Sequence, residues 1–273
     1  MAVVAQTDVP TALTIAGSDS SGGAGIQADL RGFNAAGVHG ASVITLVTAQ
    51  GTRGIRKVAP LAPDLVRAQL EAVLEDLQPR ACKTGALGNA AIVEIIADVM
   101  RAQSSIPLVV DPVVNPTRGR ALLDDSGFAA LVRELIPLAT LIIPNKDEAT
   151  RLAGRTRGIE DAKRACKAIF DMGAKHVLVK GGHFTGNDAV DLFFDGREFL
   201  ELRAPRLEVP PMHGLGCSLS ALITGHLALG LPVRDAVKRA HDVLHAALRQ
   251  PSRIGEGLSI LANLSVSPPS TQN

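Results

Sequence analysis

The sequence contains no tryptophan and no tyrosine, and aromatic residues make up only 3% of its 273 positions. Proteins that hold single-stranded nucleic acid stack the bases on aromatic side chains, so this composition argues against such a function. The formal net charge is only +1, so the surface as a whole attracts neither nucleic acid nor an anionic membrane. We therefore expect no nucleic acid and no membrane among the partners.

Cysteine and long apolar runs are also scarce. The three cysteines, Cys82, Cys166 and Cys217, are an odd number without Cys-x-x-Cys spacing, which argues against a disulfide framework or a structural zinc site. No stretch of about 18 apolar residues is present to span a membrane, and residues 1–10 lack the basic start and apolar run of a signal peptide. Together these features predict a cytoplasmic protein.

The chain alternates short apolar runs with amphipathic helical patterns. We predict strands at 12–17, 42–48, 81–84, 108–111, 141–144 and 176–180. We predict helices at 26–36, 63–77, 90–101, 124–135, 146–153 and 159–172. This alternation is typical of an α/β fold with a mostly parallel central sheet and helices on both faces.

The later part of the chain adds a hairpin and two helices. Apolar runs at 190–194 and 198–202 flank an Asp-Gly turn, which predicts antiparallel strands at one edge of the sheet. Helical patterns at 215–229 and 233–248 follow.

Domain organisation is simple because no linker and no internal repeat interrupts the pattern. We predict a single domain over residues 11–261 and a flexible N-terminus over residues 1–10. Residues 262–273 are rich in serine and proline, which predicts a disordered tail.

In open sheets of this kind, ligands bind beyond the carboxyl ends of the strands. The segment from Ala16 to Gly25, at the end of the first predicted strand, is rich in small residues, which let the backbone approach a ligand closely. A predicted helix follows, and its first N–H groups are free to bind a ligand. The spacing Gly23-x-Gly25-x-x-Ala28 matches a dinucleotide fingerprint, but the second strand ends at Gln50 instead of an acidic residue. A tight turn without a ligand is the alternative.

Polar residues at two further strand ends suit a magnesium ion on phosphates. Asp111 follows one strand, and Asn145 and Glu148 follow another, one helical turn apart. These side chains could together hold a hydrated Mg²⁺ on a triphosphate. Taken singly, each also suits a turn or a helix N-cap, but their parallel positions favour the functional interpretation.

Two glycine-containing segments suit a transferring phosphate. Lys180 follows a strand and precedes two glycines, so its ammonium either neutralises a phosphate or is a solvated surface group. Gly214 and Gly216 precede a helix, whose free N–H groups and dipole can form an anion pocket. Cys217 then lies at the helix N-terminus, where we predict a lowered thiol pKa; a buried inert cysteine is the alternative. No Walker A pattern occurs, which excludes a P-loop enzyme.

One pair of histidines invites a metal interpretation. His241 and His245 lie four residues apart on a predicted helix, beside Asp242, in a spacing similar to that of zinc proteases. The acid is Asp rather than Glu and no third ligand is evident, so we interpret them as surface histidines.

Taken together, five segments resemble those of bacterial hydroxymethylpyrimidine/phosphomethylpyrimidine kinases, a branch of the ribokinase-like family. The resemblance is in register from about Ala12 to Leu248. It points to this branch because sugar kinases of the wider family carry Asp where Cys217 stands. The segments are 13–19, 22–29, 144–149, 180–183 and 213–217.

The resemblance implies a ribokinase-like fold and an ATP-dependent enzyme. The expected reaction is phosphorylation of 4-amino-5-hydroxymethyl-2-methylpyrimidine, and of its monophosphate to the diphosphate, in thiamin biosynthesis. ATP and Mg²⁺ are the implied cofactors, and a requirement for a monovalent cation is left open. The implied partners are the pyrimidine, ATP and a second copy of the chain in a homodimer.

The resemblance also implies roles for individual residues. Asp19 and Gln50 would contact the pyrimidine, with Gly17 lining its pocket. Asp111, Asn145 and Glu148 would organise magnesium and phosphates, and Asp111 and Glu148 would hold the metal through water.

The remaining implied roles concern the transferring phosphoryl group. Lys180 would neutralise the nucleotide phosphates, and Gly214, Leu215 and Gly216 would form the anion hole. Cys217 would be the base that accepts the hydroxymethyl proton.

Several positions depart from the pattern of the family. Gly51 and Ala86 replace a common Asn and Met and enlarge the substrate pocket, which motivates a pyridoxal kinase as an alternative. Leu215 replaces the usual Thr, which motivates a second alternative, a catalytically weak pyrimidine-binding sensor. Residues 117–119 read Thr-Arg-Gly where Lys-Ser-Gly or Thr-Ser-Gly is usual. Candidate lids are the segments 115–120 and 184–188.

Overall fold

The computed structural model describes residues 8–115, 121–181 and 188–264. The Thr-Arg-Gly segment, Gly182, His183 and most of both candidate lids lie outside the described residues. So do residues 1–7 of the predicted flexible N-terminus and residues 265–273 of the predicted tail.

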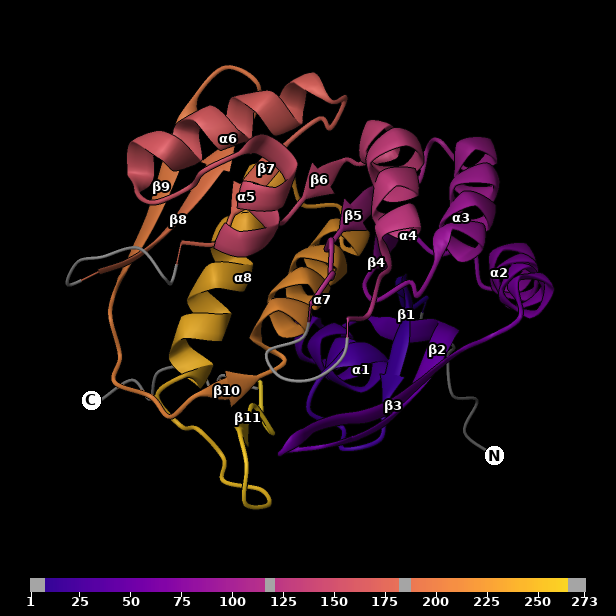
Figure 1. The fold of residues 1–273 in the computed structure, drawn as a ribbon, viewed down its shortest axis with the longest axis horizontal. Coiled ribbons are helices and arrows are strands. Elements are labelled where there is room, and N and C mark those ends of the chain that lie inside the picture. The colour runs from indigo at the N-terminus through magenta and orange to yellow at the C-terminus, as the bar shows by residue number, and fades with distance from the viewer. Residues whose placement is uncertain (1–7, 116–120, 182–187, 265–273) are drawn as a thin grey trace, which may run out of the picture.

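In the part of the chain that the structure describes, nine strands form one sheet in the order β3-β2-β1-β4-β5-β6-β7-β8-β9 (Figure 1). The strands from β2 to β7 in this order pair in parallel, whereas β3 at one edge and β8 and β9 at the other pair antiparallel. The predicted parallel sheet with an antiparallel edge hairpin is thus confirmed. The strands are β1 (Thr11–Asp19), β2 (His39–Gly51), β3 (Gly54–Pro60), β4 (Ala81–Thr84), β5 (Leu108–Val110), β6 (Leu141–Ile142), β7 (Val177–Val179), β8 (Asp188–Phe194) and β9 (Phe199–Pro205).

Strand β3 was not predicted from the sequence. Its Arg56 and Lys57 are exposed, and an edge strand of this kind shows little apolar alternation because only part of it faces a core. The pairing of β3 with β2 shifts register between Ala49 and Gln50. Such a bulge bends the strand and re-aims a side chain, here next to the end of β2.

Helices cover both faces of the sheet (Figure 1). Helices α1, α7 and α8 pack on one face, and α2 to α6 pack on the other. The predicted helix at 124–135 is present, but it changes after Ala130 into a π-helical turn and a short 3-10 helix. The helices are α1 (Gly25–Ala36), α2 (Pro63–Asp76), α3 (Ala90–Ala102), α4 (Asp125–Ala130), α5 (Lys146–Ala153), α6 (Ile159–Asp171), α7 (Leu215–Ala228) and α8 (Val233–Ala247).

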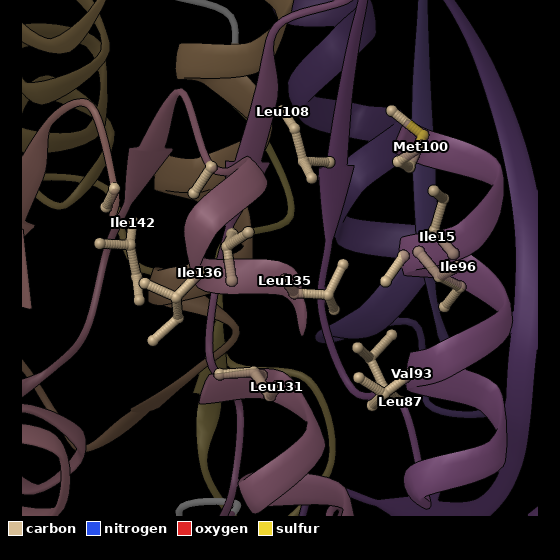
Figure 2. Close-up of a cluster of buried hydrophobic side chains, with 14 of the residues drawn as sticks. Ile15, Leu87, Val93, Ile96, Met100, Leu108, Leu131, Leu135, Ile136 and Ile142 are labelled. Carbon is tan, nitrogen blue, oxygen red and sulfur yellow. The ribbon is translucent and has the colours of Figure 1, made fainter. Parts of the chain in front are cut away.

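Two apolar clusters hold these layers together. Successive strand side chains point to opposite faces, so Leu13 and Ile15 join one cluster and Ala12 joins the other. Figure 2 shows Ile15 of the first cluster beside Ile96 of α3. The core therefore lies on both sides of the parallel strands and leaves their carboxyl ends for a ligand.

Helix α7 lies at the centre of the second cluster. Its residues from Ser218 to Ala228 are all buried, because α1, α8, β4 and β5 surround it. A helix that is apolar on all sides needs such complete cover. Among the described residues, no helix is both long and apolar enough to cross a membrane.

The last part of the described chain packs near the carboxyl ends of the parallel strands. Residues 252–260, which we call the C-terminal clasp, contain β11 (Ser259–Ile260), and β11 pairs with β10 (Met212–His213) just before α7. The N–H of Leu258 donates to the carbonyl oxygen of Thr52 in the β2–β3 turn at 2.8 Å. The sequence predicts the domain to end at residue 261, but Leu264 is buried against the second cluster, so the packed core extends to at least that residue.

Candidate functional site

A cavity of about 660 Å³ opens at the carboxyl ends of the parallel strands. It extends from Gly17 on β1 and Gln50 on β2 to Leu244 and Leu248 at the end of α8. The structure brings every predicted site residue to its wall. These are Gly17, Asp19, Gln50, Asp111, Asn145, Glu148, Lys180, Gly214, Leu215, Gly216 and Cys217.

Asp19, at the end of β1, organises the first glycine-rich loop. Its Oδ1 accepts hydrogen bonds from the backbone N–H and the hydroxyl of Ser21, both at 2.8 Å. Its Oδ2 accepts from the N–H of Ala24 at 2.8 Å and from Nε2 of His213 at 3.1 Å. Burial by itself would raise the pKa of Asp19, but the bonds from His213, Ser21 and Ala24 outweigh it and lower the pKa to about 2.

Gln50, at the end of β2, is held at both its backbone and its side chain. The hydroxyl of Ser20 donates to the Gln50 carbonyl at 2.7 Å and accepts from the Gln50 N–H at 2.8 Å. The side-chain amide contacts Oγ1 of Thr48 at 3.2 Å and Nε2 of His213. Two residues far apart in the sequence, Asp19 and Gln50, therefore meet at one imidazole.

The glycines of the first loop bring backbone close to backbone. Gly214 has a φ of +82°, and a Cβ built on it would lie 1.9 Å from the carbonyl oxygen of Gly23. A Cβ on Gly23 would in turn lie 2.8 Å from Cδ2 of His213. The sequence predicts that small residues in the first loop let the backbone approach a ligand. The structure adds a second role, because Gly23 and Gly214 also allow the first loop and the segment before α7 to contact each other.

Asn145 and Glu148 form the start of α5. The Asn145 side chain accepts hydrogen bonds from the N–H groups of Asp147 at 2.8 Å and Glu148 at 2.9 Å. The Glu148 carboxylate accepts from the Asn145 N–H at 2.7 Å, which completes a capping box. The helix-cap interpretation of Asn145 is therefore correct, and the same cap aims both side chains at the cavity.

Lys180 and two carboxylates lie together at the neighbouring strand ends. Nζ of Lys180 lies 3.0 Å from Oδ1 of the buried Asp111. Burial would lower the pKa of Lys180, but Asp111 and Glu148 outweigh it and raise the pKa, so the ammonium stays charged. Burial is the main cause that raises the pKa of Glu148 to about 7. The positive charge of Lys180 acts to lower this pKa, and the negative charge of Asp111 acts to raise it.

Gly216, in the first turn of α7, lets the helix N-terminus approach this group. A Cβ on Gly216 would lie 3.1 Å from Nζ of Lys180 and 3.7 Å from Oδ2 of Asp111. Free N–H groups at a helix start carry partial positive charge. Positive groups from α7 and β7 therefore meet at one point, as the anion-hole prediction requires.

Cys217 lies on the cavity wall, but its predicted pKa is wrong in direction. Burial raises the pKa of the thiol to about 12, and the charges of Asp29 and Asp111 raise it further. Lys83 and a hydrogen bond from the Gly25 N–H act in the opposite sense without outweighing them. The helix N-terminus alone is not enough to lower the pKa, because protein atoms surround the half-buried Cys217 and the charges of two carboxylates act on its thiol.

Three features of the cavity were missed or misread in the sequence. Nζ of Lys83 on β4 forms a fully buried ion pair with Asp29 on α1 at 2.7 Å, and Lys83 reaches the cavity wall. A lysine inside a four-residue buried strand was the signal that could have indicated it. His213 joins Asp19 to Gln50, which no local pattern shows. His241, interpreted as a surface residue, is largely buried and lines the cavity with His245.

The residues at the strand ends fit a hydrated magnesium ion. Among the described residues, no group of three or more His, Cys, Asp or Glu side chains could hold a metal ion. Asp111 and Glu148 are both buried, and burial raises the pKa of Glu148, an unfavourable effect on its charged form that a bound cation would relieve. Two carboxylates suit a Mg²⁺ ion that keeps several waters and binds mainly to phosphates.

The fold and this cavity define a small-molecule kinase of the ribokinase-like class. Among solved structures, pyridoxal kinase from Bacillus subtilis, in an ADP complex, superimposes with a TM-score of 0.87 and 34% identity over 93% of this chain and 97% of that one. Phosphomethylpyrimidine kinase from Clostridium difficile superimposes with a TM-score of 0.76 and 41% identity over 86% of this chain and 97% of that one.

Within this class, the chain belongs to the phosphomethylpyrimidine kinase family, whose model matches residues 19–262. Hydroxymethylpyrimidine/phosphomethylpyrimidine kinase from Rhizobium meliloti is 48% identical over 250 residues, which cover 90% of this chain and 94% of that protein. The family predicted from the five sequence segments is confirmed.

Proposed function

We propose that the protein transfers the γ-phosphoryl group of ATP to the hydroxymethyl group of 4-amino-5-hydroxymethyl-2-methylpyrimidine, and a second one to the resulting monophosphate, in thiamin biosynthesis. One observation carries the proposal: Lys180, Asp111 and the N-terminus of α7 converge at one part of a cavity that Gly17 and Gln50 also line. The names of the relatives support the substrate.

At the phosphate end, catalysis would rest on alignment and charge. Lys180 and the N–H groups of Leu215 and Gly216 would bind the oxygens of the transferring group. Asp111 and Glu148, aimed by the cap at Asn145, would hold Mg²⁺ through water. When bound, Mg²⁺ neutralises negative charge on the phosphates.

At the pyrimidine end, the structure changes the expected role of Asp19. A carboxylate has about four acceptor positions, and protein donors already occupy four at Asp19. We therefore propose that Asp19 holds the loop and His213, while Gln50 contacts the ring.

Cys217 is the proposed base, and its raised pKa has a measurable consequence. With a pKa of about 12, the thiolate fraction grows tenfold for each pH unit over the neutral and mildly alkaline range. We expect kcat on the alcohol to rise with a slope near one from pH 7 to 9 and the slope to vanish in Cys217→Ala. The monophosphate already carries an ionised attacking group, so its rate should show no such slope; a slope with that substrate would contradict the assignment.

A pyridoxal kinase is a second candidate with its own observation. Open space surrounds Gly51, since a Cβ there would meet no atom within 4 Å, and Ala86 lines the cavity. An aldehyde can add reversibly to the Cys217 thiol. Mass spectrometry of a pyridoxal adduct at Cys217 tests this possibility directly.

The sensor alternative rests on Leu215, and the structure gives it little support. The Leu215 side chain packs against the second apolar cluster while its backbone stays in the first turn of α7. The substitution therefore removes a hydroxyl but leaves the N–H groups in place.

The decisive experiment measures ADP release with MgATP and three acceptors, the pyrimidine alcohol, its monophosphate and pyridoxal. We expect turnover on both pyrimidines and a loss of about 100-fold or more on the alcohol in Cys217→Ala. Preference for pyridoxal would establish the second candidate. Binding of pyrimidine without ADP release would establish the sensor.

Three further expectations belong to this proposal. Turnover should require Mg²⁺, and assays in potassium, sodium and choline salts will decide on a monovalent cation. The three cysteine thiols are free, which is consistent with the proposed location of the protein in the reducing cytoplasm. A homodimer is expected from the family, and sedimentation equilibrium tests it.

A further inference from the structure

The side chain of Gln50 is fixed in place from several directions. The bulge between Ala49 and Gln50 turns it toward the cavity, and Ser20 holds its backbone through two hydrogen bonds. Its terminal amide lies between Oγ1 of Thr48 and Nε2 of His213. These contacts leave the amide one degree of freedom, a half-turn that exchanges its nitrogen and its oxygen.

His213 selects one of the two amide orientations. Asp19 is ionised at neutral pH and can only accept hydrogen bonds, so Nε2 of His213, at 3.1 Å from Oδ2, must carry a proton. With the amide nitrogen of Gln50 toward Nε2, two N–H donors face each other. A half-turn places the amide oxygen there instead and makes a hydrogen bond.

Thr48 selects the same orientation independently. Its hydroxyl has one proton, and Oγ1 lies 3.0 Å from the carbonyl oxygen of Ser18, which can only accept. With that proton given to Ser18, Oγ1 can only accept, yet Oε1 of Gln50 lies 3.2 Å from it, so Oγ1 needs a donor there instead. The amide nitrogen satisfies it, and the second N–H of that nitrogen is available to the cavity that Gln50 lines.

We propose that His213, held by Asp19, is a specificity-determining residue that orients Gln50 so that it presents an N–H donor to the substrate. This inference rests on the proposed function, because it assigns Gln50 to the pyrimidine end of the cavity. A donor at this place selects a ring-nitrogen acceptor, as in an aminopyrimidine, over a ring position without an acceptor, such as a C–H of the pyridine ring of pyridoxal. His213 acts through Gln50 and is a positioning residue.

A double-mutant cycle tests the proposal, because a residue that acts only through Gln50 has no effect when Gln50 is absent. The four proteins are wild type, His213→Phe, Gln50→Ala and the double variant. Calorimetry without nucleotide gives the Kd of the pyrimidine alcohol. His176→Phe, away from the cavity, is the matched histidine control.

We expect each single variant to weaken pyrimidine binding about 10-fold. The double variant should bind within about 2-fold of Gln50→Ala, since the effect of His213 passes through the missing amide. The KM for ATP should stay constant in all four, which a general disturbance of the loops would not allow. Multiplying losses, or an unchanged Kd in His213→Phe, would overturn the proposal.

If His213→Phe does not fold, Thr48→Val gives the same information from the other side of the amide. It removes the second orienting contact with an isosteric strand residue, so the same non-additivity with Gln50→Ala is expected; additive losses would overturn the proposal. A failure of the proposed function looks different. In that case pyrimidine binding follows the expected cycle while ADP release is absent.

Discussion

Asp19 and Glu148 are both buried carboxylates on the same cavity, yet their pKa values lie far apart. Asp19 accepts four hydrogen bonds, and its pKa falls to about 2. Glu148 accepts one from the Asn145 N–H and lies near Asp111, so burial dominates and its pKa rises to about 7. The number of donors around each group, and not the residue type, decides its charge.

The lowered pKa of Asp19 predicts a specific acid sensitivity of the fold. A carboxyl with a pKa of about 2 in the folded state and 3.8 in the unfolded state contributes roughly 2 kcal/mol above pH 5. This contribution is lost as pH falls from 3.8 towards 2. Urea unfolding should show Asp19→Asn less stable than wild type at pH 7, with the difference shrinking towards pH 3. A difference that stays constant with pH would contradict the assignment of these hydrogen bonds to Asp19.

Gly216 predicts a loss of activity without a loss of stability. In Gly216→Ala the new Cβ at 3.1 Å displaces the Lys180 ammonium, which is the flexible end of a long side chain. We expect kcat to fall by about 10-fold or more, while the helix gains up to about 1 kcal/mol from alanine. The control is Gly158→Ala, where a Cβ meets no atom within 4 Å and should leave kcat unchanged. Equal activity of the two variants would show that this close approach is not used.

At the scale of secondary-structure elements, the site is made from the ends of elements. The parallel strands bring Asp111 and Lys180 together, and two helix starts add Glu148 and the N–H groups of α7. Stability and function therefore share the same contacts. A helix cap at the cavity both stabilises its helix and positions a side chain of the site, whereas a cap elsewhere only stabilises its helix.

The two asparagine caps separate these tasks. Asn145→Ala and Asn89→Ala each remove a side chain that caps a helix, α5 and α3 respectively. Both should cost about 1 kcal/mol in the free energy of unfolding, measured in urea. Only Asn145→Ala should also raise the KM for MgATP, because it releases Glu148. Loss of activity in both variants would attribute the effect to stability alone.

At the scale of the whole molecule, the C-terminal clasp joins segments from three parts of the chain. It binds the turn at Thr52, pairs with His213 and places Ile260 beside Gly23. The pyrimidine end of the cavity is therefore assembled only when the chain is folded nearly to its described end.

Gly257 provides the test of this clasp. A Cβ on Gly257 would lie 2.1 Å from the carbonyl oxygen of Thr52, so Gly257→Ala must push the clasp away from the β2–β3 turn. We expect the KM for the pyrimidine to rise by about 10-fold with little change in the KM for ATP, since a displacement of about 1 Å misaligns the residues that hold a substrate. Gly158→Ala again serves as control. An equal rise in both KM values would point to general loosening.

The sequence predicts much of this architecture because it depends on local patterns. The apolar alternation indicates the parallel strands, and the rule that ligands bind at strand ends groups Asp111, Asn145, Glu148 and Lys180 correctly. Contacts between distant segments are a different matter. The meeting of Asp19 with His213, and the burial that raises the pKa of Cys217, depend on which loops touch, and no spacing in the chain records that.

The contact between Gly214 and Gly23 limits how the sequences of these two loops can evolve. Two loops in backbone contact cannot change separately at this point, since even a Cβ added to Gly214 would lie 1.9 Å from the carbonyl oxygen of Gly23. A substitution at this contact in one loop is therefore tolerated only together with a compensating substitution in the other loop. New substrate preferences should therefore arise at positions with free space near the cavity, such as Gly51 next to Gln50, where an added Cβ meets no atom within 4 Å.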